Sequence, residues 1–233
     1  MRVNNCLGAS SGTLAACAAA ACWDPAWLGD VFKEAVGRAA TSSLGAFSKD
    51  FVVADIIKVR FKCIQSPELI LFVFLQDMFQ DLPIDIHHQI NGRVHISLTT
   101  YSFQNLMVSE FSSKQELQDA LTCSCFLPVF SGRQLPSFRG KTFLDGGLSN
   151  NLPTLDSETV KISPFSGKLK NISPLDQSRI TMTLSQENVN LNVMNIQRHI
   201  EGLRYMNNDR INVYYDLGFS LADQFITNVL LGK

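Results

Sequence analysis

The sequence contains few charged residues. Asp, Glu, Lys and Arg together make up 18% of the 233 residues, below the roughly 25% typical of soluble domains. The net charge is −1, so there is no excess of basic residues to favour nucleic acid or an anionic membrane surface. We therefore expect no nucleic-acid partner.

Metal-binding, secretory and membrane-spanning signals are also missing. The chain has 6 cysteines and 4 histidines but no paired CxxC motifs and no Cys/His zinc spacing, so we expect no metal and no cofactor. The N-terminus lacks a basic region followed by an apolar run, which argues against a signal peptide. The longest apolar run, 69–75, is far shorter than the ~20 residues that cross a bilayer. We expect a cytoplasmic protein, at most peripheral at membranes, with reduced, buried cysteines: Cys6, Cys17, Cys22, Cys63, Cys123 and Cys125.

Apolar residues are plentiful, at 45% of the chain, which is enough for one domain with a sizeable core. Their spacing distinguishes helices, with a period near 3.6, from strands, with a period of 2. The expected helices cover 10–22, 25–40, 51–61, 113–124, 191–204 and 208–230, and the expected strands cover 94–99, 106–111, 143–144 and 160–162. Strands that alternate with helices predict an α/β fold with a mainly parallel sheet.

Several polar residues have ordinary structural interpretations. Asp24 precedes Pro25 and is expected to cap a helix, and Ser113 with Glu116 forms a capping box. Asp216 is expected on a helix surface. Three histidines that could suggest catalysis are expected at the surface. His95 is expected on the polar side of strand 94–99, and His87 and His88 are expected in a loop.

One serine lies in a motif with specific geometry, Gly8-Ala9-Ser10-Ser11-Gly12. In a GxSxG motif the serine occupies the tip of a sharp turn from a strand into a helix, and the glycines allow the backbone to approach closely. The helix start would place free amides and a positive dipole end beside the serine oxygen. The motif alone is weak, because Gly and Ser are common residues.

An aspartate lies far downstream, in Asp145-Gly146-Gly147. The glycines carry no Cβ, so the aspartate can lie close to another backbone segment. Taken by itself this sequence is also typical of a type II turn. The combination of the two motifs, with no histidine placed for a triad, is more specific than either one.

Further strings follow in order along the chain: LGASSGTLAA, NGRVHISLT, SEFSSKQELQDALTCSCFLPVFSG, FLDGGLSNNLPTL and VKISPFSG. With these strings the sequence resembles the patatin-like phospholipase family, and most closely its animal branch that contains adipose triglyceride lipase. The resemblance implies a patatin-like three-layer α/β/α fold with a mainly parallel central sheet. It implies a catalytic core over 1–167 and a helical extension of the same domain over 168–233.

The resemblance also implies the chemistry. Ser10 would be the nucleophile and Asp145 the general base that accepts its proton without a histidine, and the motif residues would be Gly8, Ala9, Ser11, Gly12, Gly146 and Gly147. The implied reaction is hydrolysis of long-chain acyl esters, triacylglycerol above all, through an acyl-enzyme. The implied setting is lipid droplet breakdown at a droplet surface, with an α/β-hydrolase-fold coactivator.

The sequence departs from the family in two places. Family members carry a first strand and a Gly-rich oxyanion loop before the nucleophile, whereas nine residues precede Ser10. We therefore expect a truncated N-terminus in which the Ser11 amide is the one remaining oxyanion donor. Residues 62–77 fit neither a helix nor a strand and interrupt the resemblance, so we interpret them as an insertion.

Three other functions stay open. The chain could be a catalytically impaired patatin-like fragment that binds lipid or the coactivator. The same dyad also serves a phospholipase or an acylglycerol transacylase. Neither the GxSxG motif nor the Asp-Gly-Gly motif distinguishes among these functions.

Overall fold

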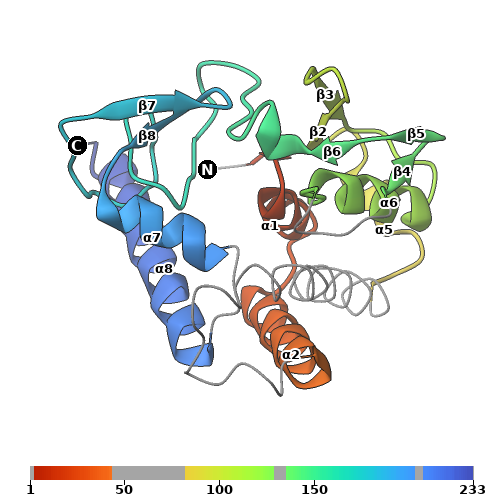
Figure 1. Cartoon of the computed structure of the whole chain (residues 1–233), viewed down its shortest axis with the longest axis horizontal. Helices are drawn as coiled ribbons and strands as arrows, with labels where there is room; N and C mark the ends of the chain where they lie inside the picture. Colours follow the sequence, from red (N-terminus) through yellow and green to blue (C-terminus); the bar gives the residue numbers. More distant parts are fainter. Residues whose placement is uncertain (1–2, 44–81, 129–134, 203–206, 233) are drawn as a thin grey trace, which may run out of the picture. The chain divides into compact units, whose positions relative to one another are not determined.

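The computed structural model describes residues 3–43, 82–128, 135–202 and 207–232 (Figure 1). The expected helix at 51–61 and the interpreted insertion at 62–77 lie outside the described residues. The chain packs as two compact units, 1–151 and 152–233. The boundary expected at 167, between the catalytic core and its helical extension, stays a prediction.

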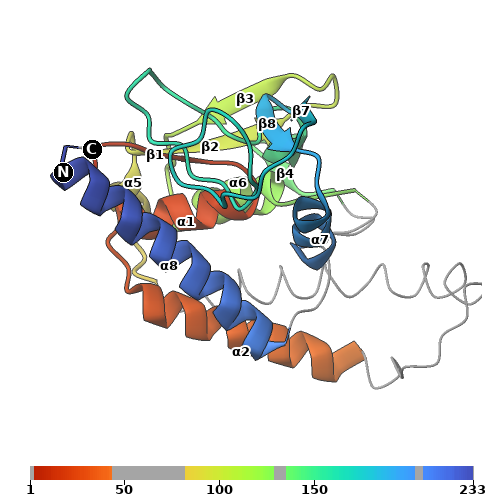
Figure 2. The ribbon, with the colours of Figure 1, turned by 90° about the vertical axis from the view of Figure 1, so that its left-hand side faces the viewer.

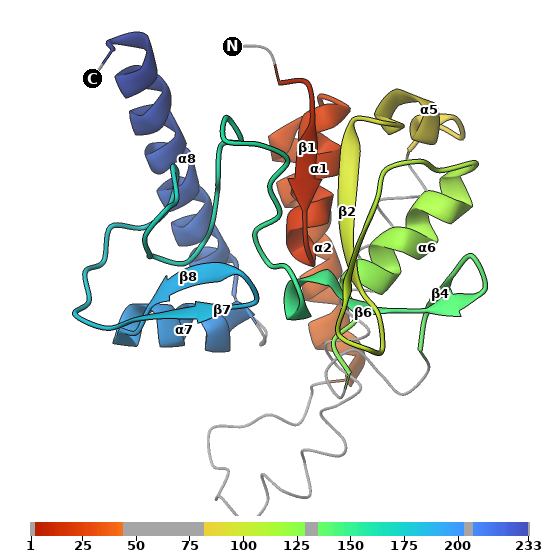
Figure 3. The ribbon, with the colours of Figure 1, turned by 90° about the horizontal axis from the view of Figure 1, so that it is seen from above.

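The first unit is built on a four-stranded sheet. Its strands are β1 (Cys6–Gly8), β2 (Val94–Thr99), β3 (Asn105–Val108) and β6 (Leu144–Asp145). β1 runs parallel to β2, as Figure 3 shows, and Gly8 lies opposite Ile96. β3 and β6 are antiparallel to β2. This start with a parallel pair, packed against helices α1 and α6, confirms the α/β class.

β1 and β6 pair with the same edge of β2, and this arrangement brings together segments that are far apart in the sequence. β3 pairs with residues 96–99 of β2 on one side. β6 pairs with Leu98 and Thr99, so it must lie on the opposite edge, where β1 pairs with residues 94–96. The parallel β1 and the antiparallel β6 therefore run towards each other along this edge. The chain leaving β1 meets the chain leaving β6 beside Ser97.

Helices cover this sheet and carry most of the apolar core. Figure 2 shows α1 (Ser11–Ala20) and α6 (Lys114–Ser124) on the same side of the strands, and both helices pack against β2. The small residues of α1 allow close approach, and Leu14, Cys17 and Ala20 are buried. The remaining elements of the unit are α2 (Pro25–Ser43), the short helix α5 (Ile86–Ile90), the hairpin strands β4 (Ser137–Phe138) and β5 (Lys141–Thr142), and the 3-10 helix η1 (Gly146–Leu148).

The expected caps are present. The Asp24 carboxylate accepts the backbone N–H of Ala26 at 2.9 Å, at the start of α2. The Ser113 hydroxyl accepts the N–H of Glu116 at 3.0 Å, at the start of α6. These bonds satisfy amides that have no partner within the helix, so the sequence located both helix starts correctly.

Two predictions about burial in this unit are wrong. β2 was expected to be half-buried, but the polar side chains of Ser97 and Thr99 are also buried, at 0% exposure. His87 was expected in a surface loop, yet it is buried within α5. Ile86 and Ile90 anchor α5 in the core, and this single helical turn carries His87 inward. His88 is exposed and His95 is half-buried.

Three of the five described cysteines, Cys17, Cys123 and Cys125, are buried as expected, whereas Cys6 is half-buried and Cys22 is exposed. All five described cysteines are free, and Cys63 lies outside the described residues. Burial raises the pKa of the Cys17 and Cys123 thiols to about 12, so these remain neutral packing groups. Cys22 is exposed, because it follows the end of α1 in a turn.

The second unit contains a hairpin that the sequence did not predict. Its elements are β7 (Thr181–Leu184), β8 (Glu187–Asn190), α7 (Val193–Gly202) and α8 (Asn208–Leu230). The turn residues Ser185 and Gln186 both have positive φ angles, 46° and 66°. Two-residue turns of this kind normally use Asn or Gly, so no turn signal was visible. The strand expected at 160–162 is wrong, because it is reduced to one bridge between Ile162 and Ile172.

The long closing helix agrees with its prediction. α8 covers Asn208–Leu230, and Asp216 is exposed on it as expected. None of the described helices is both long and apolar enough to cross a membrane.

A buried ion pair stabilises the second unit. The Lys170 Nζ lies 2.5 Å from Glu187 Oε1, and the two side chains are 0% and 2% exposed. The Ser163 hydroxyl donates to the same carboxylate oxygen, and Lys170 also donates to the Phe165 carbonyl at 2.8 Å. Each charge therefore has both a partner and further hydrogen bonds, which a buried pair requires.

Replacing Lys170 with methionine is expected to destabilise the protein. The substitution leaves the Glu187 carboxylate buried without its cation, a loss that typically costs about 3–5 kcal/mol. Urea unfolding followed by circular dichroism measures it. The exposed Lys168→Met is the matched control and should change stability by less than about 0.5 kcal/mol. Equal stability of the two variants would show that the ion pair is not needed.

Candidate active site

Ser10 lies at the tip of the turn that links β1 to α1. Its backbone angles are φ 54° and ψ −136°, a conformation that residues with a side chain adopt only when their surroundings enforce it. The Thr13 hydroxyl donates to the Ser10 carbonyl at 2.6 Å. A Cβ added to Gly8 would lie 2.4 Å from the backbone of Gly12. The turn is therefore as tight as the GxSxG motif predicts.

The two motif glycines are expected to differ in their tolerance to alanine. Gly8→Ala places a methyl group inside the backbone of the following helix turn, so we expect a loss of several kcal/mol of stability. Gly12→Ala meets nothing within 4 Å, and alanine in a helix is about 1 kcal/mol more favourable than glycine. Thermal unfolding of both variants tests this. Equal melting temperatures would contradict the tight turn.

Asp145 ends β6 and begins the 3-10 helix η1. Its Oδ1 accepts the backbone N–H of Gly147 at 2.7 Å, which fixes the orientation of the carboxylate. Its Oδ2 accepts the Ser10 hydroxyl at 2.6 Å. Asp145 is only 2% exposed, whereas Ser10 is half-buried. The structure thus brings together two side chains that are 135 positions apart in the chain.

The surroundings of Asp145 adjust its basicity. Burial raises the pKa of this carboxyl to about 6, and the hydrogen bonds from Ser10 and Gly147 act in the opposite direction. An ordinary aspartate, with a pKa near 3.9, is a weak base. A base is most effective when its pKa lies near the working pH, so burial moves Asp145 towards that range.

The glycine after Asp145 permits the close approach. A Cβ added to Gly146 would lie 2.0 Å from the Ser97 carbonyl oxygen. Only a residue without a side chain fits there without displacing β2. The Asp-Gly-Gly sequence therefore serves the contact with β2 rather than a surface turn.

A set of buried and half-buried polar groups around Asp145 was missed by the sequence analysis. The Thr99 hydroxyl donates to the Asp145 carbonyl at 2.7 Å. The Asn105 side chain donates to the hydroxyls of Ser97 and Ser149 at 2.7 and 3.1 Å. Ser97 and Thr99 occupy polar positions of β2, where the alternation of apolar and polar residues predicted contact with solvent. The apolar–polar pattern could not show that another segment covers this face.

The first turn of α1 offers one free amide beside Ser10. The N–H groups of Gly12 and Thr13 donate to the carbonyls of Ala9 and Ser10. Over the described ranges, no hydrogen bond engages the N–H of Ser11. This amide is the candidate oxyanion donor, a role that stays a prediction.

No histidine takes part in the pair. In the part of the chain that the structure describes, no hydrogen bond connects His87, His88, His95 or His199 to Ser10 or Asp145, and no group of three or more potential metal ligands gathers. His199 contacts the Asn195 carbonyl instead. The arrangement consists of two residues, a serine hydroxyl hydrogen-bonded to a buried carboxylate, and such a pair has the chemistry needed for acyl transfer through a covalent intermediate.

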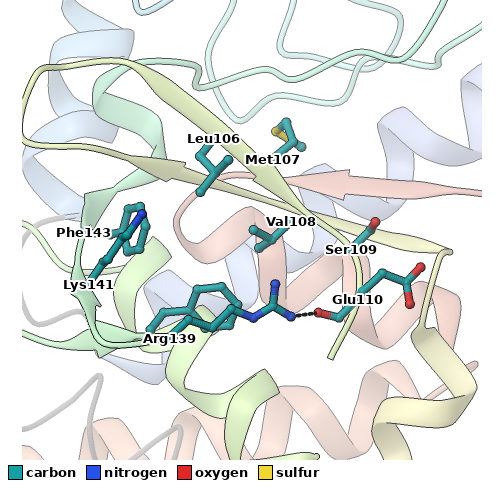
Figure 4. A pocket seen from close by; sticks show the side chains of 9 residues that line it. Leu106, Met107, Val108, Ser109, Glu110, Arg139, Lys141 and Phe143 are labelled. Atoms are coloured by element: carbon teal, nitrogen blue, oxygen red, sulfur yellow. Dashed lines mark hydrogen bonds between the residues drawn. The ribbon is translucent and has the colours of Figure 1, made fainter. Parts of the chain in front are cut away.

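A separate hollow lies along β3 (Figure 4). It encloses about 530 Å³ and is lined by Leu106, Val108, Phe138 and Phe143 among others. The Arg139 guanidinium at its rim donates to the Glu110 carbonyl at 2.7 Å. Neither Ser10 nor Asp145 lines this hollow, so it is distinct from the pair.

Comparison with known proteins gives a consistent result. The family model described as patatin-like phospholipase matches residues 1–156. The chain is 54% identical to the Mus musculus 1-acylglycerol-3-phosphate O-acyltransferase Pnpla3 over 38% of its length and 22% of the relative. It is 34% identical to the Homo sapiens patatin-like phospholipase domain-containing protein 4, over 62% of the chain and 58% of the relative.

A third relative carries a different name. The chain is 41% identical to the Homo sapiens omega-hydroxyceramide transacylase, over 43% of the chain and 19% of that protein. The matched regions thus span between about a fifth and three fifths of these relatives. No solved structure matches the chain.

Proposed function

The chain belongs to the patatin-like phospholipase family, and on that basis we propose that it is a lipid acyl hydrolase that cleaves long-chain acyl esters, triacylglycerol in particular, through Ser10 and Asp145. One observation carries the proposal, the 2.6 Å hydrogen bond from the Ser10 hydroxyl to the buried Asp145 carboxylate. The strained turn at Ser10 and the raised pKa of Asp145 support the same assignment.

The proposed reaction has two halves. Asp145 accepts the Ser10 proton while the Ser10 Oγ attacks the ester carbonyl, and the Ser11 amide faces the developing oxyanion. The intermediate collapses to an acyl-enzyme, and the leaving alcohol takes the proton back from Asp145. Water then attacks the acyl-enzyme with Asp145 again as the base, which releases the fatty acid and restores Ser10.

The setting of the reaction belongs to the proposal as well. A long-chain acylglycerol is insoluble in water, so the enzyme must act at a lipid surface. We propose a cytoplasmic protein that works peripherally at lipid droplets or membranes, assisted by an α/β-hydrolase-fold coactivator.

Acyl transfer is the second candidate function. Two relatives are named as an acyltransferase and a transacylase. The acyl-enzyme is the same in both reactions, and the outcome depends on whether water or another alcohol attacks it. A lipid hydroxyl held near Ser10 would convert the hydrolase into a transacylase.

Product analysis distinguishes these functions. The full chain is incubated with emulsified trioleoylglycerol or with phosphatidylcholine vesicles, with and without monooleoylglycerol as acceptor. Free oleate from trioleoylglycerol supports the hydrolase, and acylation of the acceptor supports the transacylase. Oleate from phosphatidylcholine alone indicates a phospholipase. A folded chain that yields none of these products, and whose Ser10 is not labelled by a fluorophosphonate, contradicts the proposal and identifies a non-catalytic fragment.

A further inference from the structure

A hydroxyl at the end of α6 contacts the backbone of the nucleophile. Ser124 is the last residue of α6, and its side chain is fully buried, at 0% exposure. Its Oγ accepts the backbone N–H of Ser10 at 3.1 Å. The same Oγ donates its proton to the Ser97 carbonyl on β2 at 2.8 Å. One hydroxyl therefore links the nucleophile's own amide to the middle of the sheet.

The Ser97 carbonyl is also the group against which the aspartate segment packs. Gly146 lies so close to this oxygen that an added Cβ would approach it to 2.0 Å. The neighbouring residue Leu98 pairs directly with Asp145. Both residues of the pair are therefore held by the same part of β2. Asp145 pairs directly with Leu98, and Ser10 is linked to the Ser97 carbonyl through the Ser124 hydroxyl.

The bond to Ser124 acts where the backbone is strained. Ser10 has a positive φ of 54°, and conformations of this kind cost of order 1–3 kcal/mol unless their surroundings hold them. An amide that is tied to a fixed acceptor cannot rotate away. The Ser10 side chain is attached to the same backbone, and its hydroxyl donates to Asp145. The position of Ser10 Oγ therefore depends on where the Ser10 amide is held.

We infer that Ser124 is a positioning residue for the Ser10–Asp145 pair: its hydroxyl holds the Ser10 turn at hydrogen-bonding distance from Asp145. This inference rests on the proposed function. It adds a residue that touches neither the substrate nor the reacting atoms. A displacement of about 1 Å at a reacting group can cost about 10²-fold in rate, so the effect is expected to be measurable.

The test compares Ser124→Ala with a matched variant of the same helix. Thr122→Ala also removes a hydroxyl from α6, but that hydroxyl donates to the Gln118 carbonyl within the helix. Each full-length variant is treated with a fluorophosphonate, and the rate of Ser10 labelling is measured from pH 5 to pH 9, together with the melting temperature. We expect labelling of Ser124→Ala to fall about 10- to 100-fold, and labelling of Thr122→Ala to stay within about twofold of the original chain.

The pH profile separates positioning from a general loss of structure. The hydrogen bond from Ser10 lowers the pKa of Asp145, so a looser Ser10 turn should shift the labelling midpoint to higher pH. An unshifted midpoint with an unchanged labelling rate in Ser124→Ala would overturn the inference while leaving the dyad intact. If the original chain is not labelled at Ser10, the proposed function itself has failed.

A second variant covers the case in which Ser124→Ala does not fold. Ser124→Cys keeps a similar volume with a much weaker hydrogen-bonding group. A folded Ser124→Cys with slowed labelling supports the positioning role, and one labelled at the original rate contradicts it. Loss of the fold in both variants would also overturn the inference, because it would assign Ser124 to folding rather than positioning.

Discussion

Ester hydrolysis is expected to fall by at least about 10³-fold when Ser10 is replaced by alanine, because removal of a catalytic nucleophile typically costs 10³- to 10⁶-fold. The variant retains Asp145, the Ser11 amide and the surrounding groups, so binding of the substrate should persist. The loss should therefore appear in kcat rather than in KM. Hydrolysis of a chromogenic long-chain ester measures both constants.

The exposed Ser102 provides the control for this prediction. Ser102→Ala removes a serine hydroxyl from the same unit, but its partner is Thr100 at the surface, so hydrolysis should stay close to that of the original chain. A Ser10→Ala variant that remains folded and keeps more than a tenth of the original kcat would exclude Ser10 as the nucleophile.

The second large effect is expected for Asp145→Asn. Asparagine has nearly the same shape, and its side-chain oxygen can still accept the N–H of Gly147. It cannot accept the Ser10 proton, and a positioned general base typically contributes 10²- to 10⁴-fold. We expect kcat/KM at pH 8 to fall within this range. The same steady-state assay measures it.

Stability provides the internal check on Asp145→Asn, because it should change in the opposite direction. Burial raises the pKa of Asp145 from 3.8 to about 6, so ionisation of this carboxyl costs the folded state about 3 kcal/mol at pH 8. The folded state binds the Asp145 proton more tightly than the unfolded state does. The cost of ionising Asp145 is therefore absent below pH 4, grows as the pH rises towards 6, and is complete above pH 6. Asparagine removes the cost, so the variant should unfold at higher urea concentration at pH 8 but not at pH 4. A variant that is both inactive and less stable at pH 8 would indicate damage to the fold instead.

Much of this site could be predicted from the sequence because each motif has a local physical cause. The glycines around Ser10 require a tight turn wherever the chain places them, and the Ala-rich segment after it forms the close-packed helix α1. The Asp-Gly-Gly sequence likewise signals close approach to another backbone. The capping box of Ser113 and Glu116 made the start of α6 visible for the same reason.

Other features depend on which segments meet, and a single strand or helix does not reveal this. Ser97 and Thr99 look like solvent-facing positions of β2 until the turn after Asp145 covers them. His87 looks like a loop residue until Ile86 and Ile90 anchor α5 in the core. The β7–β8 hairpin turns through Ser185 and Gln186, which carry no turn signal. Each missed feature is a tertiary contact that overrides a local pattern.

The most direct test of the account is the pH dependence of Ser10 reactivity. The rate of fluorophosphonate labelling of Ser10, located by peptide mass spectrometry, is measured from pH 4 to pH 9 in the original chain and in Asp145→Asn. If Asp145 takes the proton directly, labelling should rise with a midpoint near pH 6, where burial places the pKa of this carboxyl, and the rise should vanish in the variant. A midpoint that persists unchanged in Asp145→Asn would assign the base to another group and contradict the dyad.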